Sequence, residues 1–173
     1  MMKKLQKART VKRANNFDRT ALVCATDLLA RQDHSEARLR QKLKVRKYSE
    51  EDIDKAIDTL KKHNYLNDER ACDYQFDIMY NSNKYSMKQI YAKLMSLGFE
   101  EQLINKYKPE DYEEHEEFTA VRLLKMKFKT PTEIKKMQQF LYTKGFDYSV
   151  ISSSINQFKI DFVNVPNSVE GEI

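Results

Sequence analysis

The chain repeats one pattern of residues three times, at intervals of about 50 residues. In each copy two large apolar residues lie one helical turn apart, an aromatic residue follows them, and an isoleucine comes next. The corresponding sets are Leu39, Leu43, Tyr48 and Ile53; Ile90, Leu94, Phe99 and Ile104; and Met137, Leu141, Phe146 and Ile151. Because a unit of this length buries its apolar face only against its neighbours, the repeat predicts a stacked array of helical units.

The units contain residues that commonly begin and end helices. Ser35 and Ser86 are good N-caps, because a serine hydroxyl accepts a hydrogen bond from a free amide of the first helical turn. Gly98 and Gly145 stand where a residue in the left-handed conformation commonly ends a helix. We therefore expect an elongated all-α array of three tandem three-helix repeats, with about nine helices and essentially no strand.

The pattern divides the chain of 173 residues into five segments. We expect a basic N-terminal extension at 1–16, three-helix repeats at 17–64, 65–107 and 108–158, and a flexible C-terminal tail at 159–173. The low content of breakers, Gly 3 and Pro 3, argues against a β-sandwich with many tight turns. No run of apolar residues is long enough to span a membrane, and the N-terminus lacks the apolar segment of a secretory signal. Cys24 and Cys72 fall in helical patterns typical of buried thiols, which favours a reducing, cytoplasmic location.

The segment Asp33 to Lys47 predicts a short helix that is strongly basic outside its apolar seam. After Glu36 it contains no acidic residue, and it carries six cations: Arg38, Arg40, Lys42, Lys44, Arg46 and Lys47. One interpretation is a solvated surface helix. The other is a helix that contacts a nucleic acid, and the net charge of +5 with a pI of about 9.0 fits a polyanionic partner.

A second group of cations belongs to the middle of the chain: Lys84, Lys88 and Lys93. Tyr85 and Tyr91 lie beside these lysines, so they are the aromatic residues that we consider for base stacking. Most other aromatic residues occupy apolar seams, where packing in the core accounts for them. These lysines form a second candidate nucleic-acid contact.

Acidic residues crowd the start of the third unit: Glu113, Glu114, Glu116 and Glu117. Carboxylates near a helix N-terminus are stabilised by the helix dipole, which accounts for the first few of them. The run is longer than the dipole requires, so these residues are also a candidate patch for a basic surface of a partner protein.

No catalytic or metal-binding pattern is present in the sequence. His34, His63 and His115 are scattered and form no zinc-ligand spacing. The chain has no glycine-rich phosphate-binding loop. We therefore expect a protein that is not an enzyme and that carries no metal or cofactor.

Several short motifs resemble the RecX family of recombination regulators over residues 21 to 158. They are His34-Ser35-Glu36, Lys42-Leu43, Tyr65-Leu66-Asn67-Asp68-Glu69-Arg70, Tyr85-Ser86 and Gly98-Phe99. The Tyr65 to Arg70 segment is the most specific of them. Three features depart from the family pattern: Ala71 replaces an aromatic residue, Lys47 replaces a glycine, and a glycine usual near Tyr85 is missing.

The resemblance implies a cytoplasmic bacterial protein that binds the RecA recombinase filament and restrains its ATP hydrolysis and strand exchange. It also implies a curved array that lies along the groove of the filament. Binding to single- and double-stranded DNA without strong sequence preference belongs to the same implication, and we expect a monomer.

Two alternative functions compete with this hypothesis. A DNA-binding transcription regulator could present a recognition helix from a three-helix unit to the major groove. Against it, the cations of residues 38–47 surround their helix, as expected for phosphate contacts rather than for base recognition. A helical scaffold without nucleic acid is the third class.

Overall fold

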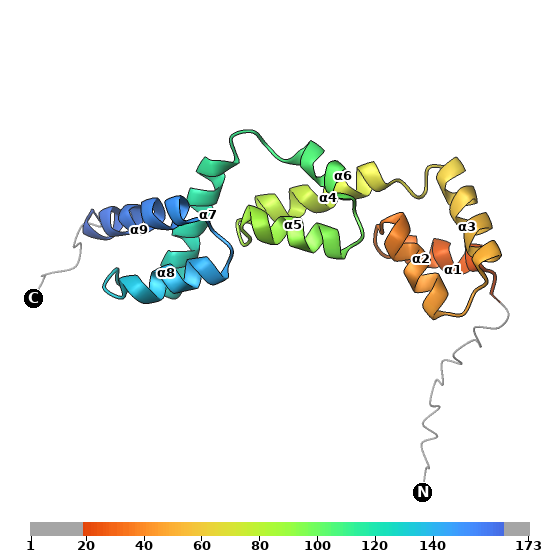
Figure 1. Ribbon diagram of the computed structural model, residues 1–173, viewed down its shortest axis with the longest axis horizontal. Coiled ribbons are helices and arrows are strands. Elements are labelled where there is room, and N and C mark those ends of the chain that lie inside the picture. Colours follow the sequence, from red (N-terminus) through yellow and green to blue (C-terminus); the bar gives the residue numbers. More distant parts are fainter. Residues whose placement is uncertain (1–18, 165–173) are drawn as a thin grey trace, which may run out of the picture.

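The computed structural model describes residues 19–164. Within that range the chain forms helices joined by turns and loops, and it contains no strand. The expected basic extension at 1–16 lies outside the described residues. The helices are α1 (Ala21–Leu29), α2 (Glu36–Val45), α3 (Glu50–Lys62), α4 (Asp68–Asn81), α5 (Met87–Ser96), α6 (Glu101–Tyr107), α7 (Tyr112–Lys127), α8 (Ile134–Thr143) and α9 (Tyr148–Val163). They form an elongated, curved array of three three-helix repeats (Figure 1). This confirms the predicted fold class.

Each repeat has a hydrophobic core of its own. Leu39, Leu43, Ile53 and Ile57 are fully buried in the first core, between α1, α2 and α3. The second core gathers Cys72, Phe76, Ile90, Leu94, Phe99 and Ile104, and the third gathers Leu124, Met137, Leu141, Phe146, Ile151 and Ile155. The helix pairs that pack closely all lie within one repeat. The apolar residues of the repeated pattern therefore build three separate cores.

The middle helix of each repeat ends in the same way. Its C′ residue has a positive φ angle, which is 66° at Lys47, 89° at Gly98 and 86° at Gly145. The next amide then donates back into the helix, as at Phe99, whose N–H donates to the Leu94 carbonyl oxygen at 3.2 Å. The predicted left-handed glycines are confirmed, and Lys47 adopts the same conformation despite its Cβ.

The junction between the first two repeats is polar and close. The Ser35 hydroxyl caps α2 by accepting from the Arg38 amide at 3.1 Å, and it also donates to the Leu97 carbonyl oxygen of the second repeat at 2.5 Å. The Asp68 carboxylate accepts from the Glu36 amide at 2.8 Å. A Cβ at Gly98 would lie only 2.8 Å from the Ser35 Oγ atom, so the close approach requires glycine there.

The junction between the second and third repeats uses the same arrangement with different residues. The Ser86 hydroxyl donates to the Lys144 carbonyl oxygen at 2.7 Å, and the Glu116 carboxylate accepts from the Met87 amide at 2.8 Å. A Cβ at Gly145 would lie 3.2 Å from the Ser86 Oγ atom. In both junctions, therefore, a serine N-cap meets the last carbonyl of the next middle helix, and a carboxylate meets the first amide of the capped helix.

These junctions place the three middle helices in a row, in the order α8, α5, α2. The C-terminus of α8 meets the N-terminus of α5, and the C-terminus of α5 meets the N-terminus of α2. Figure 1 shows the three helices along the lower side of the array. The partial charges at the helix ends are therefore opposed favourably at each junction.

Helix α9 extends beyond the predicted start of the C-terminal tail, and residues 165–173 of that predicted tail lie outside the described residues. Helix α9 continues through Val163 instead of ending before residue 159. Asp161 explains the extension, because its carboxylate pairs with Lys125 of α7 at 2.6 Å and accepts from the Gln157 side chain at 2.7 Å. These contacts hold the last turn of α9 in place.

Candidate nucleic-acid interface

Helix α2 carries its cations on two flanks, one on each side of its buried seam. Leu39 and Leu43 form that seam and have 0% exposure. Arg40 and Lys44 each follow a seam residue and lie on one flank, whereas Arg38, Lys42 and Arg46 lie on the opposite flank at intervals of one turn. The two flanks differ in their neighbours.

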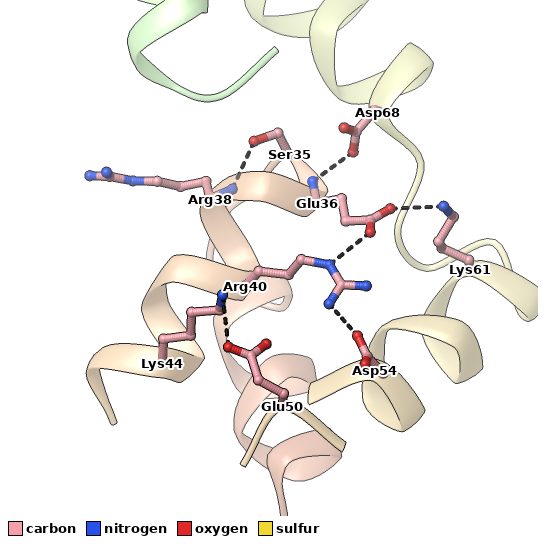
Figure 2. Close-up of polar contacts among 9 residues, drawn as sticks. All are labelled: Ser35, Glu36, Arg38, Arg40, Lys44, Glu50, Asp54, Lys61 and Asp68. Atoms are coloured by element: carbon pink, nitrogen blue, oxygen red, sulfur yellow. Dashed lines mark hydrogen bonds and ion pairs between the residues drawn. The ribbon is translucent and has the colours of Figure 1, made fainter. Parts of the chain in front are cut away.

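The Arg40 flank is neutralised by carboxylates of the same repeat (Figure 2). The Arg40 guanidinium contacts Glu36 through Nε at 2.8 Å and Asp54 through Nη1 at 2.5 Å. Lys44 Nζ pairs with Glu50 at 2.8 Å. Sequence reasoning expected Arg40 and Lys44 to project toward a partner, but the structure engages both in ion pairs within the repeat.

Glu36 is the centre of this network. Hydrogen bonds from Lys61 and then from Arg40 lower the pKa of the Glu36 carboxyl below its ordinary value. The hydrogen bonds that the Arg40 guanidinium donates to Asp54 and then to Glu36 raise the pKa of Arg40. Glu36 therefore remains charged and ties α2 to α3 beside the first junction.

The opposite flank of α2 holds cations that form no ion pair with a described residue. The Arg38 guanidinium donates to the Gln41 side chain at 2.8 Å, and that of Arg46 donates to the Lys42 carbonyl oxygen at 2.7 Å. Figure 2 shows Arg38 pointing away from the carboxylate network. Burial, then Lys42 and Arg38, lower the pKa of the neighbouring His34, which favours its neutral form. The Arg38 flank therefore presents positive charge that the repeat leaves uncompensated.

The predicted contacts of the second repeat lie on and before α5. Lys84 and Lys88 are exposed, and Lys93 is exposed with its ammonium 4.7 Å from the centre of the Tyr85 ring. Tyr85 and Tyr91 are only partly buried, but both pack against the second core. The two tyrosines therefore contribute to packing as well as lying beside the lysines.

Acidic and basic residues are segregated between the helices. Helices α5 and α8 contain no Asp or Glu, and α2 contains Glu36 alone. Carboxylates are concentrated on the first and third helices of the repeats, where they include Glu50, Glu51, Asp52, Asp54 and Asp58 of α3 and Asp68, Glu69, Asp73 and Asp77 of α4. The row of middle helices is therefore the basic part of the array, which sequence reasoning recognised only for α2 and α5.

The acidic run of the third repeat is divided by burial. Glu113 and Glu114 are exposed and Glu117 is half-buried, but Glu116 has only 5% exposure. Burial raises the pKa of the Glu116 carboxyl, and the hydrogen bond from the Met87 amide opposes that effect. Glu116 therefore serves the junction between repeats and does not belong to an exposed acidic patch. Nothing in the sequence around Glu116 distinguishes it from the other glutamates of the run.

The described residues offer neither a membrane-spanning helix nor a cluster of metal ligands. No helix in residues 19–164 is both long and apolar enough to cross a membrane. The same range contains no group of three or more His, Cys, Asp or Glu side chains placed to hold a metal ion.

Comparisons with known proteins agree with the architecture. A family model described as the first three-helix domain of RecX matches residues 21–60. The regulatory protein RecX of Caldanaerobacter subterraneus is 32% identical over 130 residues, which are 75% of this chain and 66% of that protein. This chain thus spans slightly less than two thirds of that relative.

Two other similarities cover more of the related protein. The regulatory protein RecX of Vibrio campbellii is 30% identical over 136 residues, which are 76% of this chain and 87% of the relative. The crystal structure of RecX from Lactobacillus salivarius superposes with a TM-score of 0.68 at 20% identity, over 81% of this chain and 95% of that one, and so shares the fold. Together with the three-helix repeats, these similarities show that the chain belongs to the RecX family of regulatory proteins.

Proposed function

We propose that this protein regulates a RecA-type recombinase by binding both the recombinase filament and DNA. In this proposal the array inhibits ATP hydrolysis and strand exchange by the recombinase, and thereby modulates recombination and DNA repair. Membership of the RecX family supports the choice of partner. The protein acts as a monomer in the bacterial cytoplasm and recognises single- and double-stranded DNA without strong sequence preference.

The Arg38 flank of α2 is the observation that carries the DNA-binding part of the proposal. Arg38 and Lys42 lie one turn apart on one side of α2, Arg46 follows as its C-cap, and no described carboxylate pairs with them. Cations at this spacing suit successive phosphates of a backbone, which carry no sequence information. Arg40 and Lys44 support the fold of the first repeat instead of contacting DNA.

Glu113, Glu114 and Glu117 are proposed to contact a basic surface of the recombinase. They lie in the first turns of α7. Replacing all three by Gln should weaken co-sedimentation with recombinase filaments, while the free energy of unfolding changes by less than about 1 kcal/mol. Unchanged co-sedimentation of the folded variant would remove this patch from the proposal.

The salt dependence of DNA binding tests the nucleic-acid surface. Each phosphate neutralised contributes roughly −0.7 to −0.9 to the slope of log K against log salt, so Arg38→Gln/Lys42→Gln should flatten the slope by about one to two. The control variant Lys55→Gln/Lys125→Gln loses the same charge from two side chains that form surface ion pairs in the structure. It should keep the wild-type slope.

Fluorescence anisotropy with labelled oligonucleotides of several unrelated sequences measures these slopes. The Arg38/Lys42 variant should lose affinity about equally for all sequences, and it should inhibit the DNA-dependent ATPase of the recombinase less than wild type does. An unchanged slope would show that the DNA-binding surface does not include the Arg38 flank of α2. A loss confined to one sequence would favour a sequence-specific regulator.

A further inference from the structure

The Arg38 flank has counterparts on the other two middle helices. The repeat aligns Arg38 and Lys42 of α2 with Gln89 and Lys93 of α5, and with Lys136 and Phe140 of α8. None of these positions is acidic. At Phe140, however, an aromatic side chain replaces the lysine of the first two repeats, so the sequence pattern alone shows a gap in the positive charge.

Two lysines from outside this position restore the charge at Phe140. Lys127, at the end of α7, places its ammonium 4.1 Å from the centre of the Phe140 ring, and Lys144, the C-cap of α8, places its own at 5.8 Å. Phe128 packs edge-on against Phe140, with ring centres 5.9 Å apart. Neither lysine forms an ion pair with a described residue. The ring therefore holds two ammonium groups through cation–π contacts.

The second repeat shows the same kind of contact on the same flank. There Lys93 lies over the Tyr85 ring at 4.7 Å. A cation that contacts an aromatic face keeps its net positive charge, because the ring carries no formal charge to cancel it. The ammonium groups of Lys93, Lys127 and Lys144 therefore remain available to an anion, unlike those of lysines paired with carboxylates.

The junction between the second and third repeats joins these two groups of cations. The Lys144 carbonyl oxygen accepts the hydrogen bond from Ser86, which caps the N-terminus of α5. A Cβ at Gly145 would lie 3.4 Å from the Lys88 Cβ and Cδ atoms. Lys88 of the second repeat therefore lies against Gly145, the residue that follows Lys144, and the basic row continues across the junction.

We propose that Lys127 and Lys144, held over Phe140, form a third phosphate-binding site that extends the DNA surface over all three repeats. This inference rests on the proposed DNA binding and adds the third repeat to it. Each middle helix has 10 residues and so is about 15 Å long, so the three helices together comprise about 45 Å of helix. At about 3.4 Å per base pair this corresponds to some 13 base pairs of duplex.

The test compares the salt slopes of charge-matched variants on a duplex of mixed sequence of about 20 base pairs, longer than the row. Lys127→Gln/Lys144→Gln should flatten the slope of log K against log salt by about one to two relative to wild type. Lys127→Arg/Lys144→Arg keeps the cations and should keep the slope. The Lys55→Gln/Lys125→Gln control loses the same net charge and should also keep it. Far-UV circular dichroism and the thermal midpoint establish that each variant is folded.

The outcomes separate this inference from the proposed function. If Arg38→Gln/Lys42→Gln flattens the slope and folded Lys127→Gln/Lys144→Gln does not, DNA binding stands and the third site is wrong. If the control flattens the slope as much as Lys127→Gln/Lys144→Gln, net charge alone explains the effect and the third site is also wrong. If wild type shows no salt-dependent affinity for the duplex, the proposed function fails together with the inference.

Discussion

The Ser86 hydroxyl donates a hydrogen bond to the Lys144 carbonyl oxygen, 2.7 Å away, across the junction between the second and third repeats. The same hydroxyl accepts from the Gln89 amide at 3.2 Å, so one side chain both caps α5 and joins two repeats. Because the three cores are separate, these polar contacts are a main source of coupling between repeats.

Replacing this serine should therefore cost more than the loss of an ordinary cap. Ser86→Ala removes the cap and leaves the partly buried Lys144 carbonyl without its donor, so we expect destabilisation by about 1–3 kcal/mol. Ser49→Ala is the matched control, because Ser49 caps α3 on an exposed surface and contacts no other repeat. Its expected cost is about 0.5–1 kcal/mol. Urea denaturation measures both, and equal costs would show that the cross-repeat bond contributes nothing.

The stability lost on substituting each junction glycine should depend on how closely the neighbouring repeat approaches it. Gly98→Ala combines strain of about 1–2 kcal/mol at φ +89° with a contact of 2.8 Å to Ser35 Oγ. At Gly145 the corresponding distance is 3.2 Å, so Gly145→Ala should cost less than Gly98→Ala. Lys47→Ala keeps a Cβ in the same left-handed conformation and should change stability by less than about 0.5 kcal/mol. Thermal unfolding of the three variants gives this order, and a Gly145 variant less stable than the Gly98 variant would contradict it.

The buried Glu116 carboxylate gives the second junction a dependence on pH. Burial raises its pKa in the folded state, so its contribution to stability is fully present below the unfolded pKa and is lost as pH rises through the folded pKa. Glu116→Gln keeps an acceptor for the Met87 amide without the buried charge. We expect its free energy of unfolding to rise relative to wild type as pH increases above about 4.

Other groups titrate in the same range, so the difference between the two proteins is the quantity to measure. Burial also raises the pKa of Asp68, whereas hydrogen bonds lower that of Glu36, whose contribution is lost as pH falls. Both are present in wild type and variant, and their effects cancel in the difference. Urea titrations at several pH values measure it. A difference that stays constant would show that Glu116 keeps an ordinary pKa, and one that moves toward wild type as pH rises would show that its pKa is lowered in the folded state.

The sequence predicted the repeats, the serine caps of α2 and α5, and the cores, because these depend on local spacing. Leu39 and Leu43 had to share a face of any helix that included them, and Gly98 suited only a helix end. The role of Glu116 was not predictable in this way, because it depends on the Met87 amide of another repeat. The split of the α2 cations was missed for a related reason. Helical spacing separates Arg38 from Arg40, but only the placement of α3 brings Asp54 to Arg40.

The cysteines allow the coupling between the first two repeats to be measured. Cys24 lies in the first core and Cys72 in the second, and both are buried free thiols, as the sequence predicted. Burial raises the pKa of the Cys72 thiol to about 11. Alkylation by iodoacetamide should therefore be slow in the native protein and should follow the unfolding of each repeat.

Labelling with iodoacetamide across a urea series, with each cysteine identified by peptide mass spectrometry, should give coincident transitions for Cys24 and Cys72 in wild type. Ser35→Ala breaks the hydrogen bond to the Leu97 carbonyl oxygen and should separate the two transitions, because adjacent repeats unfold together only through their interface. Ser86→Ala acts at the other junction and should leave them coincident. Transitions that are already separate in wild type would show that the junction does not couple the repeats, and the array would then act as a chain of independent units.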